Sequence, residues 1–225
     1  VAGRRNDRIG VVAFAAEAFT QAPLTLDHNV VVNLISELER FGMVVDRADP
    51  RLDGLLAEIK EREAQGYAYD GAQASFELLA RAELGRMPEF FEVKRYRVTV
   101  ERRKNKYDQM VSLSEAVVVV KINGEKKLSV SESMDETGSD RGPVNALAKA
   151  LAKDLGQYQA AIDDMHLVDF KVRITQGGTE AVTRVIIDSE DGQGRRWSTV
   201  GVSANIVDAS FEALLDAIRW KLVRD

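Results

Sequence analysis

The pattern of apolar residues changes its period once along the chain, close to Pro88. Upstream of this point, apolar residues recur at i, i+3, i+4 and i+7, which predicts one helix beginning after Asp49-Pro50 and a second ending at Gly85. Downstream, apolar and polar residues largely alternate from Phe91 to Val100, and Val117 to Val120 form a β-branched run. This second part is therefore predicted to be rich in strands.

The strand-rich part contains an internal repeat. The segment SEAVVVVKI from Ser114 parallels TEAVTRVII from Thr179, an offset of 179 − 114 = 65. The segment VNALAKALAKDL from Val144 parallels VDASFEALLDAI from Val207, an offset of 207 − 144 = 63. Each copy has a strand pattern ahead of it, and Asn123-Gly124 predicts a tight hairpin in the first copy. Residues 88–225 thus consist of two predicted βββα units.

These elements predict an α+β fold, with a helical linker subdomain followed by a domain of two βββα units related by pseudo-two-fold symmetry. We leave residues 1–30 unassigned and place the helical linker at 31–86 and the duplicated domain at 87–225, with repeats at about 88–160 and 163–225. One three-stranded sheet with one helix leaves apolar surface bare, so the two units should pack together. Symmetric association of two chains would cover the remainder, and we expect a homodimer.

Composition and charge exclude several classes of function. A net charge of −5 and a pI near 5.3 argue against electrostatic binding of nucleic acid. No run approaches the roughly 20 apolar residues of a membrane span, although the arginines before Ile9–Phe19 imitate a secretory signal that Glu17 interrupts. The absence of cysteine fits a cytoplasmic location.

The sequence offers no constellation for catalysis. Its two histidines, His28 and His166, have no second histidine at metal-ligand spacing, and the acidic stretch ESMDETGSD lacks the ligand register of a calcium loop. Nucleotide-binding and hydrolase motifs are missing from it as well. We therefore expect no catalytic residue, no metal site and no cofactor in this chain.

The helix that begins with GPVNALAKAL has the features of a small binding site. Gly142 leaves room at its start, and Pro143 gives up an N–H that would be unpaired in any case. Unpaired amides and the helix dipole at such a start suit a carboxylate or a phosphate. An aliphatic wall follows at i, i+3 and i+7, formed by Val144, Leu147 and Leu151. An anionic head above a branched apolar body describes an aliphatic amino acid, although the same face would also serve as plain core.

Several longer segments resemble a known family. EAQGYAYDGAQASFELL, FFEVKRYRVTVERR, GPVNALAKAL and GGTEAVTRV are similar to the C-terminal linker and regulatory region of (R)-citramalate synthases, within the 2-isopropylmalate synthase family. The resemblance covers roughly residues 31–225. It implies an allosteric regulatory and dimerisation domain that follows a metal-dependent catalytic barrel, and this chain shows no motif of that barrel. The parent would condense acetyl-CoA with pyruvate, and the fragment alone would be inactive.

The resemblance also implies an effector site at the dimer interface. Carried over by motif position, it comprises Gly142, Pro143, Val144, Leu147 and Leu151, with Ala204 and Ile206 from the second repeat. The implied effector is isoleucine, acting in feedback inhibition. Two alternatives stay open, namely a 2-isopropylmalate synthase fragment that senses leucine and a dimerisation module without an effector. The turn before the helix departs from the family pattern, because Asp140 and Arg141 replace a glycine and an asparagine.

Overall fold

The computed structural model describes residues 12–15, 17–20, 28–134, 142–176 and 181–225. The chain divides into two units, residues 1–60 and residues 61–225, and each is described by itself. The altered turn at Asp140 and Arg141 and most of the acidic stretch before it lie outside the described residues.

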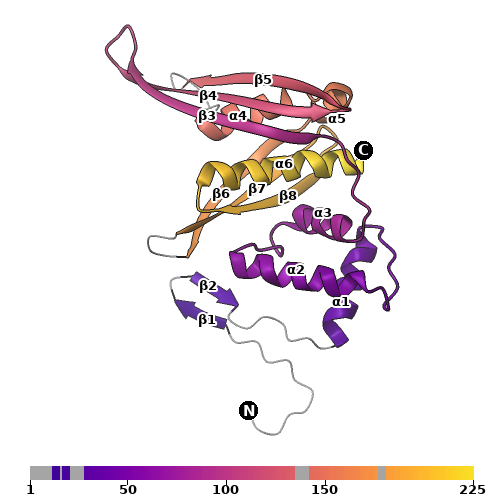
Figure 1. Ribbon diagram of the computed structural model, residues 1–225. Helices are drawn as coiled ribbons and strands as arrows, with labels where there is room; N and C mark the ends of the chain where they lie inside the picture. The colour runs from indigo at the N-terminus through magenta and orange to yellow at the C-terminus, as the bar shows by residue number, and fades with distance from the viewer. Residues whose placement is uncertain (1–11, 16, 21–27, 135–141, 177–180) are drawn as a thin grey trace. The chain divides into compact units, whose positions relative to one another are not determined.

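The first unit contains a short hairpin and two helices (Figure 1). Strands β1 (Val12–Ala15) and β2 (Glu17–Thr20) pair antiparallel, and helix α1 spans His28–Arg40. Helix α2 (Arg51–Gln65) begins in this unit and ends in the next. Asp49 accepts a hydrogen bond from the Arg51 N–H at 3.0 Å, so the predicted helix start after Asp49-Pro50 is confirmed.

After the end of α2, the second unit contains helix α3 (Gln73–Glu83), whose end is followed by Gly85 at a φ of +65°. Two three-stranded antiparallel sheets follow, each with a helix after it. The first repeat consists of β3 (Glu92–Lys104), β4 (Met110–Ile122), β5 (Glu125–Met134) and α4 (Pro143–Ala152). A 3₁₀ turn (Gly156–Tyr158) and the short helix α5 (Gln159–Ile162) lead to the second repeat, with β6 (His166–Gln176), β7 (Val182–Glu190), β8 (Arg196–Ser203) and α6 (Ile206–Arg224).

Each sheet follows the order of the chain, β3-β4-β5 and β6-β7-β8. Asn123 and Gly124 form the turn between β4 and β5 with φ angles of 49° and 89°, and Ile122 pairs with Glu125 across it. Positive φ at both positions is what a two-residue hairpin requires, so this turn prediction is confirmed. The predicted α+β fold with repeated βββα units is confirmed as well.

The two repeats share one apolar core. Helix α4 contacts β4 and β5, helix α6 contacts β7 and β8, and the two helices contact each other (Figure 1). The core combines both sheets and both helices, with Val118, Leu147, Val185 and Leu214 each at most 3% exposed. Because the two repeats share this buried core, each repeat stabilises the other. In the described part of the chain, no helix is long and apolar enough to cross a membrane.

Candidate functional site

The start of α4 has no side-chain cap among the residues that the structure describes. Gly142 is the N-cap, with a φ of +88° that favours glycine, and Pro143 occupies the first turn. No side chain of the described residues caps this helix, whereas at α6 the Asn205 side chain accepts a hydrogen bond from the Val207 N–H at 2.9 Å. The two helices occupy equivalent places in the repeat, and of these two it is α4 whose first amides no described side chain occupies.

A buried acceptor lies in the same first turn of α4. The Asn145 Oδ1 atom is buried and has no hydrogen-bond partner among the residues that the structure describes. A buried polar atom without a partner costs about 1–3 kcal/mol, so a donor at this point would be stabilising. Unpaired N–H groups and an unpaired side-chain acceptor thus lie within one turn of helix. The N–H groups can donate to the carboxylate of an amino acid, and the Asn145 oxygen can accept from its ammonium group.

The structure separates the three residues of the predicted aliphatic wall. Leu147 is fully buried and Leu151 is 1% exposed, and both belong to the core between the sheets. Val144 is partly buried at the edge of that core. Of the three, only Val144 is placed where a ligand at the helix start would meet it without a rearrangement of the core.

The predicted residues of the second repeat lie at the start of α6. Ala204 and Ile206 are both exposed, with Ile206 at 45%. The structure therefore places Gly142, Pro143 and Val144 at one helix start and Ala204 and Ile206 at the other.

Two hairpins that extend past these helix starts carry solvent-exposed apolar side chains. In Figure 1, the β3–β4 and β6–β7 hairpins both run beyond the first residues of α6. Val100 and Ile174 lie on the strand faces that carry core residues farther along, yet they are 54% and 68% exposed. Val172 and Met110 are 41% and 55% exposed on the same faces. We call Val100, Met110, Val172 and Ile174 the arm residues.

The arm residues were not predicted from the sequence, although a sequence pattern relates two of them. Val100 and Ile174 occupy equivalent places in RYRVTV and DFKVRI, at an offset of 174 − 100 = 74. Alternation shows that both face the same side of a strand as their apolar neighbours, but it does not show where the covering helix ends.

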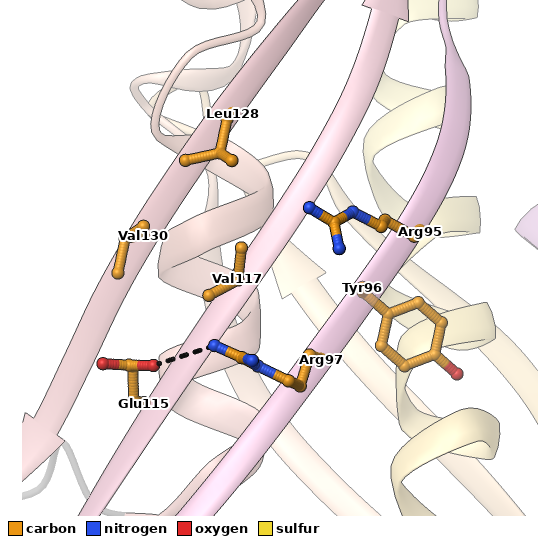
Figure 2. A pocket seen from close by; sticks show the side chains of 7 residues that line it. All are labelled: Arg95, Tyr96, Arg97, Glu115, Val117, Leu128 and Val130. Carbon is orange, nitrogen blue, oxygen red and sulfur yellow. Dashed lines mark ion pairs between the residues drawn. The ribbon is translucent and has the colours of Figure 1, made fainter.

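A separate hollow of about 330 Å³ lies on the other face of the first sheet (Figure 2). Arg97 and Glu115 form an ion pair of 3.6 Å on this face. The hollow is lined by Arg95, Tyr96, Arg97, Glu115, Val117, Leu128 and Val130. None of the predicted effector residues lines it.

Comparison with known proteins gives a consistent result. The family described as the LeuA allosteric (dimerisation) domain matches residues 70–222. An (R)-citramalate synthase of Geobacter sulfurreducens is 41% identical over 84% of this chain and 34% of its own length, and one of Aquifex aeolicus is 39% identical over 86% and 35%. A 2-isopropylmalate synthase of Methanocaldococcus jannaschii is 36% identical over 37% of this chain and 15% of its own length. The chain spans about a third of the length of the two citramalate synthases.

Proposed function

Since the chain belongs to the family of the LeuA allosteric (dimerisation) domain, we propose that it is the regulatory part of a citramalate synthase and binds isoleucine at the start of α4. The parent enzyme would condense acetyl-CoA with pyruvate in the cytoplasm, and isoleucine would inhibit it. The identity of 39–41% to two citramalate synthases supports this parent over a 2-isopropylmalate synthase, which would sense leucine.

The proposal depends on one observation, namely that the first turn of α4 holds both uncapped backbone N–H donors and a buried acceptor. The uncapped amides after Gly142 would receive the carboxylate, and Asn145 Oδ1 would accept from the ammonium group. Val144 would supply aliphatic surface for a branched side chain, and the exposed Ile206 at the start of α6 would add to it where two chains meet. The hydroxylated or charged side chains of other amino acids would gain nothing from this surface.

The test is calorimetric titration of isoleucine and leucine into the protein, with 3-methyl-2-oxopentanoate as a third ligand. The oxo acid keeps the carboxylate and side chain of isoleucine but has no ammonium group. We expect isoleucine to bind best, and the oxo acid to bind about tenfold more weakly or worse because Asn145 is left unpaired. Asn145→Leu should abolish the difference between isoleucine and its oxo acid. Absence of heat from both amino acids at millimolar concentration would rule out sensing by this chain.

The arm residues favour homodimerisation as a second function that does not depend on the effector. Monomeric proteins rarely leave several large apolar side chains exposed in one region, and in a symmetric dimer the arm residues of the two chains would cover one another. Sedimentation equilibrium should show a dimer that Ile174→Lys dissociates. Leu167→Lys is the matched control, because Leu167 lies at the other end of β6 and is 44% exposed. Equal dissociation by both variants would contradict the arm interface.

A further inference from the structure

Strand β8 is an edge strand, and side chains bond two of its backbone amides. The Val200 N–H donates to Ser75 Oγ of α3 at 3.0 Å, and the Val202 N–H donates to a Glu212 carboxylate oxygen of α6 at 2.9 Å. Ser75 is 4% exposed. The contact between α3, β8 and α6 is therefore a partly buried polar junction, in which side chains bond individual backbone amides.

Two carboxyl groups of α6 contribute to this junction, in addition to the bonds that Glu77 of α3 accepts from Trp220 and Arg224. Glu212 and Asp216 lie one turn apart, on the same face of the helix. The Tyr67 hydroxyl donates to Glu212 at 2.6 Å, and the Ser75 hydroxyl donates to Asp216 at 2.7 Å. Tyr67 precedes α3 and Ser75 lies within it, so both bonds tie the segment 66–83 to α6.

The surroundings of Asp216 disfavour its charged form. Burial raises the pKa of Asp216 to about 6, although the Ser75 hydrogen bond works in the opposite direction. The neighbouring Glu212 contributes to this increase in the pKa, whereas the charges of Arg219 and Arg62 act against it. Burial also raises the pKa of Tyr69, to about 12, so that its hydroxyl stays neutral here. The groups that act on Asp216 are Glu212 and Arg219 of α6, Arg62 at the end of α2, Tyr69 of the connecting segment, and Ser75 of α3.

We propose that the contact of residues 66–83 with α6 is a proton-dependent latch, in which the docked state takes up one proton on Asp216. This proposal does not depend on amino-acid binding. The docked state binds the proton more tightly than an undocked one, in which Asp216 has an ordinary pKa near 3.9. Docking is therefore strongest in acid and weakens as the pH rises through 6. Between pH 5 and pH 7.5 the docking equilibrium should fall on the order of tenfold.

The Val200 amide reports the latch directly, because Ser75 is its hydrogen-bond partner. We expect its protection from hydrogen exchange, corrected for the intrinsic pH dependence of exchange, to fall about tenfold from pH 5 to pH 7.5. Asp216→Asn keeps the shape of the side chain without its charge, and protection should then be independent of pH. Asp208→Asn is the matched control, because Asp208 also lies on α6 but bonds to Tyr96 instead of the segment 66–83. It should keep the tenfold dependence of the unsubstituted chain.

An identical pH profile at Val200 in the unsubstituted chain and in Asp216→Asn would overturn the proposal. The carboxyl ¹³C shift of Asp216 in the unsubstituted chain is a second measurement that needs no variant. A titration midpoint near 6 is expected, and a midpoint near 4 would show that docking takes up no proton.

Discussion

Tyr96 of β3 stacks on Phe211 of α6, with ring centroids 4.0 Å apart and planes inclined by 29°. The Tyr96 hydroxyl also bonds to Asp208, one turn earlier on the same helix. The first strand of one repeat is thus held by the helix of the other. At the equivalent places, Phe170 replaces Tyr96 and Ala148 replaces Phe211, at offsets of 170 − 96 = 74 and 211 − 148 = 63. The duplication is therefore asymmetric where its halves meet.

Phe211→Ala should destabilise both repeats together. Phe211 is 6% exposed and belongs to the shared core, so its loss removes the Tyr96 stack and leaves a cavity. We expect a loss of about 3–5 kcal/mol in the free energy of unfolding, in a single transition. Urea unfolding followed by circular dichroism measures it. Tyr107→Ala, at a side chain 69% exposed near the β3–β4 turn, should change the value by less than about 0.5 kcal/mol. Equal effects of the two variants would contradict this role of Phe211.

Gly201→Ala should be poorly tolerated although it adds only a methyl group. Gly201 lies where β8 crosses α6, and a Cβ there would clash with the Ala209 carbonyl oxygen and lie 2.9 Å from the Ala213 nitrogen. Because the obstacle is helix backbone, α6 must move, and we expect a loss of about 1–3 kcal/mol or more. Thermal unfolding of this variant should be compared with that of Gly71→Ala, where the nearest atom to the added methyl is Ile186 Cδ1 at 3.8 Å. A Gly201→Ala protein as stable as Gly71→Ala would show that α6 adjusts freely.

Much of the fold follows from local patterns. The change of period near Pro88, the repeat at offsets of 63 and 65 and the Asn123-Gly124 turn are each contained in a few neighbouring residues. The Tyr96 contact with Phe211 joins residues 115 positions apart (211 − 96 = 115), and nothing local marks it. A single sequence shows that each repeat needs a partner surface, but it does not show that the helix of one repeat stacks on the first strand of the other.

The site could be predicted only to the level of its helix. Spacing at i, i+3 and i+7 places Val144, Leu147 and Leu151 on one face, which the structure agrees with. Spacing does not show where along that face the side chains become fully buried. In the structure this change comes between Val144, which is partly buried, and Leu147, which is fully buried. The unpaired Asn145 oxygen likewise depends on its neighbours in space, which no spacing rule contains.

Val144→Asp and Leu147→Asp should therefore act differently. Leu147 is fully buried among apolar side chains, so a carboxylate there should unfold the domain whether or not a ligand is present. Val144 is partly exposed, so Val144→Asp should keep the circular dichroism spectrum of the fold but weaken isoleucine binding at least tenfold, by repelling the ligand carboxylate. Calorimetry on a folded Val144→Asp protein decides the matter. Unchanged affinity would place the effector elsewhere.

An ion cluster with Lys221 and Asp191 buried at its centre lies at the end of α6, and we expect it to influence how the stability of the domain responds to acid. Lys221 is 2% exposed, and its Nζ atom lies 3.3 Å from Asp191 Oδ2 and 2.8 Å from Asp225 Oδ2. The Arg195 Nε atom donates to Asp191 at 2.6 Å. Burial alone would raise the pKa of Asp191, but the hydrogen bonds from Arg195 and Lys221 outweigh it and hold that pKa well below its usual range.

Asp191→Asn should lower stability at pH 7 and flatten its dependence on pH in acid. A carboxyl group whose pKa is depressed by folding stabilises the folded state above its ordinary pKa near 3.9, and this contribution is lost as the pH falls below that value. Asp191→Asn has no carboxylate at this position and therefore no such contribution to lose, so its unfolding free energy should decline less steeply between pH 4 and pH 2. Asp108→Asn is the matched control, because Asp108 pairs with Lys104 at 2.7 Å and both side chains are exposed. Exposed pairs contribute about 0–1 kcal/mol, so this control should keep the steep decline of the unsubstituted chain. Urea unfolding at each pH gives the slopes, and parallel slopes for Asp191→Asn and the unsubstituted chain would show that Asp191 titrates normally.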